Sequence, residues 1–390
     1  MLEKWVQELK DGEQELIAWR RYLHQHPELS FEETNTSAFI ADQLRSFGIE
    51  VRTNVGGNGV LGFLEGGQPG RTIAFRADFD ALPIQDEKDA PYKSTVPGVM
   101  HACGHDGHTA ALLGVARVLS HHRETLKGKL VFIFQHAEEK PPGGAKFMIE
   151  DGCLDGVEAV YGIHLSSEIP LGKIGLKSGP AMAAADAFSI EINGKGGHGA
   201  RPHQTVDSIV IGSQIVNGLQ QVVSRRVDPT ESAVLTIGVF QAGTAFNVIA
   251  DKAKIEGTVR TFNKDIRKEV ENEIRSIVKG LTDAYHAGYE IDYLNGYPAL
   301  VNADAETERV RELVSRLYGA DAFMDLKPAM GAEDFAYYLE QRPGAFIIVG
   351  ARNEDERTHF AHHHPRFDFD ERALLISGHI FLALALEYLQ

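Results

Sequence analysis

Cysteine is scarce in this chain of 390 residues, which contains only Cys103 and Cys153. Two cysteines are too few for a disulfide framework, and this fits a reducing compartment. Residues 1–5 lack the apolar core of a signal peptide, so we expect a cytoplasmic protein. Long apolar runs are missing too. The most apolar helical stretch, residues 373–389, still contains a glycine, a histidine and a glutamate, which indicates a buried terminal helix rather than a membrane span.

Positive charge is also in short supply, with 39 Lys and Arg against 55 Asp and Glu and a formal net charge of −16. This excess of acid argues against nucleic acid or an anionic membrane as the partner. The hydrophobic fraction of 43% and the charged fraction of 24% are ordinary for a soluble globular protein. The length is sufficient for two domains with separate cores.

The chemistry that the sequence does offer is concentrated in residues 101–109, His-Ala-Cys-Gly-His-Asp-Gly-His-Thr. Cys103 and His105 are two residues apart, so in an extended segment their side chains point to the same side. A thiolate and an imidazole together bind transition metals. A helix is expected over residues 109–119, and its dipole favours a thiolate at Cys103. The stretch predicts a metal site, while a nucleophilic Cys103 with a histidine base remains the alternative.

Acidic residues follow two strands that we expect to be buried. Residues 72–77 lead into Asp78 and Asp80, at the strand end where open α/β sheets keep their sites. Loop capping is an equally good explanation of these two aspartates. The apolar run 129–134 leads into Glu138 and Glu139. Adjacent glutamates project in different directions, so one can bind metal while the other acts as a base. A solvated charged loop is the competing interpretation.

Histidines occupy two comparable positions further along the chain. His164 lies near the end of an expected strand over residues 157–165. Residues 358–368 contain a histidine tract that follows a strand at 345–349 and precedes a closing helix from residue 371. Both positions suit a metal ligand.

The pattern of elements changes at residue 185. Residues 185–295 predict the order β-α-β-β-α-β, the ferredoxin-like arrangement. The flanking segments predict an α/β fold, a mixed sheet with helices on both faces. We therefore expect one domain made of residues 1–184 and 296–390, with residues 185–295 inserted as a compact unit whose opening and closing segments lie close together.

Several motifs, taken in order, resemble one known family over nearly the whole chain. The family is that of the metal-dependent amidohydrolases and peptidases, which includes N-acyl-amino-acid deacylases, hippurate hydrolases and auxin-conjugate hydrolases. Together the motifs are far more specific than any one alone. They are Arg-Ala-Asp-Phe-Asp-Ala-Leu-Pro at 76–83, the stretch 101–109, Ala-Glu-Glu at 137–139, His164, Gly-Gly-His at 196–198, Phe-Asn-Val-Ile at 246–249, Glu-Asp-Phe at 333–335 and His-His-Pro-Arg-Phe at 363–367.

The resemblance implies a catalytic domain with two divalent metal ions and an inserted lid that often dimerises, hence a homo-oligomer. The ions could be zinc, manganese, cobalt or nickel. The expected reaction hydrolyses the amide bond of an N-acyl amino acid, such as an N-acetyl or N-benzoyl amino acid. Carried over by position, Glu138 is the general base, and the lid supplies His198 as oxyanion donor and Asn247 as a substrate-carboxylate ligand. The implied metal ligands are Cys103, His105, Glu139, His164 and His363.

Some positions depart from the family pattern. His136 and Ala250 stand where proline is common, and His136 could add an imidazole to the site. His362 and His364 flank His363, so the last ligand could be displaced by one residue.

Three other functions compete with the amidohydrolase. A metal-dependent aminopeptidase or dipeptidase would use the same scaffold. A cysteine hydrolase built on Cys103 would leave the glutamates and distant histidines unexplained. A non-catalytic binding protein on a decayed enzyme fold would lack a ligand or the base, and none is missing here.

Overall fold

The computed structural model describes residues 1–390, and its backbone contacts divide the chain into two compact units. The first unit comprises Met1–Ala181, Val301–Lys327 and Asp334–Gln390. The second comprises Met182–Leu300 and the short segment Pro328–Glu333. That short segment is held by backbone hydrogen bonds in which the N–H of Ala183 donates to the carbonyls of Ala329 and Gly331, at 3.0 Å each.

The first unit is built on an eight-stranded mixed sheet in the order β1-β2-β4-β3-β5-β16-β6-β15. This confirms the expected mixed α/β class. Its strands are β1 (Glu50–Val55), β2 (Gly59–Glu65), β3 (Gln68–Asp78), β4 (Lys127–Gln135), β5 (Ala159–Pro170), β6 (Ile174–Leu176), β15 (Phe323–Asp325) and β16 (Gly344–Arg352). Its helices are α1 (Leu2–Asp11), α2 (Glu13–Gln25), α3 (Thr34–Ser46), α4 (His105–His121), α5 (Gly144–Glu150), α8 (Asp304–Tyr318), α9 (Ala336–Gln341) and α10 (Arg372–Tyr388).

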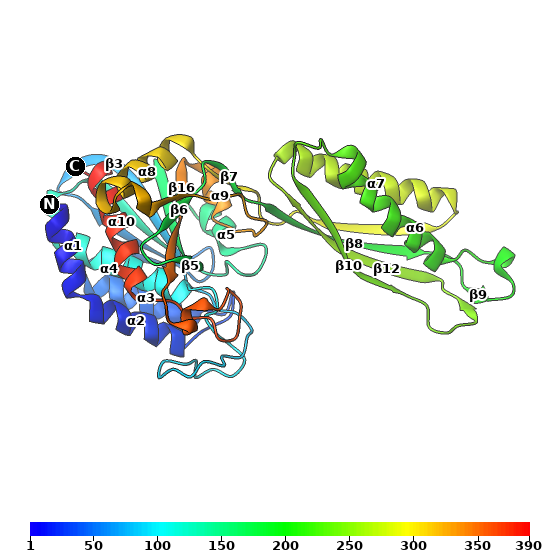
Figure 1. Cartoon of the computed structure of the whole chain (residues 1–390), viewed down its shortest axis with the longest axis horizontal. Helices are drawn as coiled ribbons and strands as arrows, with labels where there is room; N and C mark the ends of the chain where they lie inside the picture. The colour runs from blue at the N-terminus through cyan, green and yellow to red at the C-terminus, as the bar shows by residue number, and fades with distance from the viewer. The chain divides into compact units, whose positions relative to one another are not determined.

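The core of this unit follows from its apolar strands and helices. Residues 130–135 of β4 are all buried, so both faces of that strand are covered. Helices α4 and α10 pack together and against β3, and α5 packs on β4. The terminal helices α1 and α10 also pack against each other, and Figure 1 shows the two chain ends on the same side of the unit. None of the helices combines the length and the apolar character that a membrane span requires.

Parallel pairing brings the strand ends that carry chemistry to one edge of the sheet. Strand β3 runs parallel to β4 and β5, and β5 runs parallel to β16. The segments that leave β3, β4 and β16 therefore emerge on the same side. Asp78 ends β3, Glu138 and Glu139 follow β4, and the histidine tract follows β16. His164 lies within β5, because pairing with β16 extends that strand beyond the expected Leu165 to Pro170.

The second unit has the element order β8-α6-β10-β12-α7-β13 and a four-stranded antiparallel sheet in the order β10-β12-β8-β13. Ala187 pairs with Leu294, so the strands that open and close the segment lie side by side. Its elements are β8 (Ala184–Asn193), β9 (Gly197–His198), α6 (Ser208–Gln221), β10 (Ala233–Ala242), β11 (Val248–Ile249), β12 (Lys252–Thr261), α7 (Lys264–Ala284) and β13 (Gly288–Leu294). Two short strands, β7 (Gly179–Met182) and β14 (Leu300–Asn302), pair where the chain passes between the units.

One local expectation was wrong. Helix α4 begins at His105 rather than at Thr109, so Cys103 and His105 do not lie on one extended segment. Gly104 between them has a φ of 97°, a left-handed conformation that glycine adopts without strain. The turn, rather than strand alternation, decides where the two side chains point.

Candidate metal centre and catalytic residues

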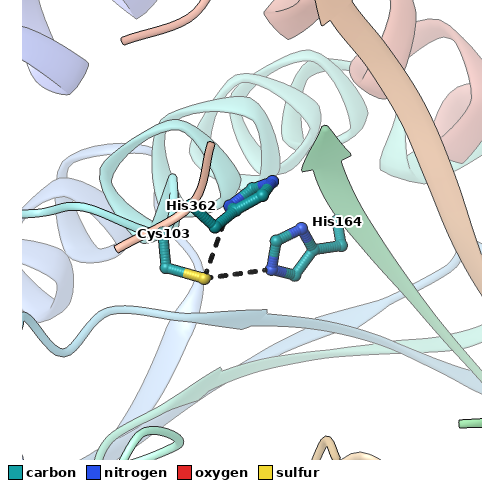
Figure 2. Close-up of side chains that lie close together, drawn as sticks. All are labelled: Cys103, His164 and His362. Atoms are coloured by element: carbon teal, nitrogen blue, oxygen red, sulfur yellow. Dashed lines mark hydrogen bonds between the residues drawn. The ribbon is translucent and has the colours of Figure 1, made fainter. Parts of the chain in front are cut away.

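The Sγ atom of Cys103 belongs to two groups of potential metal-ligand atoms. In the first, it lies 3.4 Å from Nε2 of His164 and 3.7 Å from Nδ1 of His362. Figure 2 shows these three side chains close together. In the second, it is joined by His105 and Glu139. Within each group the ligand atoms all lie within 4.8 Å of one another. The two groups therefore share the thiol of Cys103.

His363 reaches the second group through Glu139. Its Nε2 lies 3.2 Å from Oε1 of Glu139, and this ion pair raises the pKa of His363. The N–H of His363 donates to the carbonyl of Ala102 at 2.8 Å, which joins this loop to the segment that carries Cys103. Nδ1 of His364 accepts from the N–H of Arg366 at 3.0 Å, so of the flanking histidines only His362 contacts the ligand groups.

Hydrogen bonds fix the tautomers of two ligand candidates. Nδ1 of His105 donates toward the backbone carbonyl and the carboxylate of Asp80, at 3.0 and 3.1 Å. Its Nε2 is buried and has no hydrogen-bond partner. Nδ1 of His164 donates to the carbonyl of Leu165 at 2.7 Å. In the neutral form of both rings the lone pair is therefore on Nε2, which is the atom that faces the ligand groups.

His108 lies near the same atoms but is not available to a metal. Its Nδ1 bonds to Oδ1 of Asp78 at 2.6 Å, and its Nε2 accepts from the N–H of Leu165 at 2.9 Å. Both ring nitrogens are occupied. We infer that His108 is a buried support for the strand that carries His164.

Asp78 and Asp80 lie below the surface and form hydrogen bonds that hold the residues of the site in place. Both are buried, and Asp80 accepts hydrogen bonds from His105 and from the N–H of Glu139, the latter at 3.0 Å. Burial alone would raise the pKa of Asp78, but the charges of Arg76 and then His105 hold it well below its usual range. Arg76 also donates to Gln135 and Asp334, at 2.8 and 3.0 Å. This network joins the ends of β3 and β4 beneath the site.

The two adjacent glutamates point to different partners. Ala137 has a φ of 52°, which turns the chain sharply after β4. Glu139 joins the ligand group that contains Cys103. The Oε2 atom of Glu138 lies 3.9 Å from Nε2 of His105, so its carboxylate borders the same group. Oε1 of Glu139 lies 4.0 Å from the same nitrogen, so it is membership of the Cys103 group that distinguishes Glu139 from Glu138.

The charges of the site favour bound cations. Burial and then the carboxylates of Glu139 and Glu138 raise the pKa of the Cys103 thiol well above its usual range. Burial opposes the protonation of His105, yet attraction to Asp78 and bonding to Asp80 raise the pKa of its imidazole to about 10. The helix dipole by itself thus does not produce a thiolate at Cys103. Divalent cations would supply the positive charge that allows these donors to lose their protons.

Neither ring nitrogen of the unusual His136 has a hydrogen-bond partner. Its ring is buried and meets Phe31 edge-on, with ring centroids 5.7 Å apart. A Cβ atom on Gly57 would lie 3.0 Å from its Nε2, so the ring faces the turn between β1 and β2.

The predicted lid residues lie together in the second unit. His198 in β9 pairs with Val248 in β11, and the N–H of Gly199 donates to the carbonyl of Asn247 at 2.9 Å. His198 and Asn247 are both exposed. Nδ1 of His198 accepts from the N–H of Ala200 at 3.0 Å, which places the ring proton on Nε2.

The sequence matches Peptidase family M20/M25/M40 over residues 74–387, and the chain belongs to this family. It is 51% identical over 303 residues to an N-acyl-L-amino acid amidohydrolase of Geobacillus stearothermophilus, covering 78% of this chain and 81% of that protein. It is 44% identical over 363 residues to an N-acetyl-L-cysteine deacetylase of Bacillus subtilis, covering 93% and 85%. Among solved structures, a dinuclear metal-binding peptidase of the M20 family from Bacillus subtilis superposes with a TM-score of 0.84 at 39% identity, covering 97% and 98%.

Proposed function

We propose that this protein is a metal-dependent amidohydrolase that cleaves the amide bond of N-acyl amino acids and releases a carboxylate and a free amino acid. The observation that carries the proposal is the pair of ligand groups that share Cys103, with Glu138 beside them. The similar amidohydrolase and deacetylase support the substrate class.

The residues present fit a pair of divalent ions. The buried Nε2 of His105 has no hydrogen-bond partner, and thiol, imidazole and carboxylate donors together suit zinc or a similar transition metal. The similar dinuclear peptidase supports two ions per chain. In this proposal His362 is a second imidazole beside Cys103 rather than a substitute for His363. The five ligands are Cys103, His105, Glu139, His164 and His363.

The chain's own residues would move the protons of the reaction. When bound, the ions supply Lewis acidity toward the amide carbonyl and lower the pKa of the attacking water. Glu138 takes the proton of that water as it attacks the carbonyl carbon, and later delivers a proton to the leaving amine. Asp80 holds the site in place because it bonds both His105 and the backbone of Glu139.

The second unit carries two further residues of the proposed catalytic set, His198 and Asn247. Nε2 of His198 carries the ring proton, because Nδ1 accepts from Ala200, and an exposed N–H of this kind can donate to the developing oxyanion. Asn247 beside it can bind the substrate carboxylate through its amide N–H groups. We propose that this unit is a ferredoxin-like lid, in support of which its elements follow the βαββαβ order.

The lid is also our proposed surface for a homo-oligomer. Strand β10 is at an edge of its sheet, and Val234 and Phe240 on that strand are 37% and 41% exposed. An exposed edge strand with apolar side chains is suited to pairing with another copy. Sedimentation of the full chain tests this proposal.

A metal-dependent aminopeptidase or dipeptidase is the second function to be tested, because the family and the similar solved structure are named as peptidases. The deciding experiment is a panel of N-acetyl amino acids, N-benzoyl amino acids and dipeptides, assayed with added zinc, manganese, cobalt or nickel. The proposal predicts that an N-acyl amino acid has the highest kcat/KM. A dipeptide with a free amine as the best substrate would favour the alternative.

A further inference from the structure

The turn between β4 and Glu138 contains a strained residue. Strand β4 ends at Gln135, and Ala137 two residues later has a φ of 52°. A residue with a Cβ atom adopts this left-handed conformation only when its surroundings hold it there. Because Ala137 directly precedes Glu138, its backbone conformation determines the direction in which the Glu138 side chain leaves the chain.

Two buried carboxylates hold this turn, one on each side of Glu138. Oε1 of Glu33 accepts from the N–H of Ala137 at 2.8 Å. Oδ2 of Asp80 accepts from the N–H of Glu139 at 3.0 Å. Glu138 is therefore the residue between two anchored backbone amides.

Glu33 is well fixed for this task. It directly precedes helix α3, its side chain is fully buried, and its Oε2 accepts from Nδ2 of Asn58 at 3.0 Å. No cationic side chain forms an ion pair with it, and a buried carboxylate without a cation is costly to the fold. The neighbouring Glu32 is exposed. Its burial and its hydrogen bonds thus distinguish Glu33 from an ordinary surface glutamate.

We propose that Glu33 is a positioning residue that holds Ala137 in its left-handed conformation and thereby directs the Glu138 carboxylate toward the reacting water. The inference rests on the proposed function, because it takes Glu138 as the general base. Glu33 itself touches no reacting atom. Its effect should appear in kcat, since it acts on the base, and not in KM or metal content.

The test compares Glu33→Ala and Glu33→Gln with the wild type, using the N-acetyl amino acid that the wild type hydrolyses fastest. A displaced catalytic group costs up to about 10²-fold in rate, so Glu33→Ala should lower kcat by about 10–100-fold with KM and bound metal unchanged. Glu33→Gln should restore kcat, because its amide oxygen can still accept from Ala137 while Asn58 flips to accept from its amide nitrogen. The matched control, Glu32→Ala, should match the wild type.

Several outcomes would overturn the proposal. These are a normal kcat for Glu33→Ala, a loss of metal that accounts for the lower rate, or a Glu33→Gln variant as slow as Glu33→Ala. If Glu33→Ala does not fold, Glu33→Asp takes its place, because the shorter side chain withdraws the carboxylate from Ala137. A low kcat in folded Glu33→Asp supports the proposal and a normal one contradicts it. A wild type that hydrolyses no N-acyl amino acid would instead refute the proposed function.

Discussion

The Nε2 atom of His164 lies 3.4 Å from the Sγ of Cys103, although 61 residues separate the two in the chain. The carbonyl of Leu165 accepts a hydrogen bond from Nδ1 of His164, so the lone pair of Nε2 faces the sulfur. Cys103 also belongs to the group formed with His105 and Glu139. A single thiol thus connects both candidate metal positions.

Removing this shared thiol should affect both ions. Cys103→Ala is expected to bind fewer than one divalent ion per chain and to lose hydrolysis, because each ligand group loses a member. Cys153→Ala is the matched control, since Cys153 is buried and belongs to neither group. Metal analysis after gel filtration measures the result. Two tightly held ions in Cys103→Ala would show that the thiol is not a ligand.

The two adjacent glutamates should respond differently to substitution. Glu138→Gln keeps the shape of the side chain but removes the base, so kcat should fall by about 10²–10⁴-fold while metal stays bound. Glu139→Ala should lose metal together with activity, because its carboxylate lies among Cys103 and His105. Metal content and kcat are measured on the same samples. An empty site in Glu138→Gln and a filled one in Glu139→Ala would reverse the two roles.

The sequence predicted the elements better than it predicted the partners of the site residues. The expected strands at residues 72–77 and 345–349 lie within β3 and β16, since the pattern of apolar residues is a local property. The bond of His108 to Asp78 and that of Glu33 to Ala137 span 30 and 104 residues. Such pairs follow from how α4 and the start of α3 are placed against the ends of β3 and β4. The start of α4 at His105 depended on the left-handed Gly104, which a helical pattern does not reveal.

Motif resemblance, by contrast, indicated residues that the structure places together. Cys103, His105 and Glu139 form one ligand group, and His363 contacts Glu139. The sequence left open which histidine of the tract contacts Cys103, because three consecutive histidines cannot be told apart without the loop conformation. In the structure it is His362. His363 has a φ of 65°, so its side chain leaves the loop in a different direction from that of His362.

His198, in the unit that we propose to be a lid, should contribute to catalysis without binding metal. An oxyanion donor typically contributes about 10²–10³-fold in kcat. His198→Ala should therefore lower kcat by about that factor, with metal content and thermal unfolding unchanged. His203→Ala, another exposed histidine of the same unit, is the control. A near-normal kcat for His198→Ala would leave the lid with a binding or oligomerisation role only.

Stability should depend on pH through Glu33. Burial raises the pKa of Glu33 from 4.5 to about 7. Between these values the folded chain binds more protons than the unfolded chain, so the free energy of unfolding falls as pH rises. The loss attributable to this group approaches about 1.4 kcal/mol per pH unit within that window. This loss of stability is absent below 4.5, the pKa of Glu33 in the unfolded chain.

Glu33→Gln cannot ionise and should not show this loss. Urea unfolding of both proteins at about pH 5 and about pH 7, with metal removed, measures the difference. The variant should gain stability relative to the wild type at the higher pH. Glu32→Gln, at an exposed position, should follow the wild type. If the difference in unfolding free energy between wild type and Glu33→Gln were the same at both pH values, this would contradict a raised pKa at Glu33.

The most direct test of the central claim is a metal titration of chelated protein with hydrolysis of an N-acetyl amino acid as the readout. Verified metal-free protein should be inactive, because Glu138 alone does not generate the nucleophile or polarise the amide. Activity should return as zinc or manganese is added and should reach its plateau at two ions per chain. Full activity in metal-free protein would contradict the account.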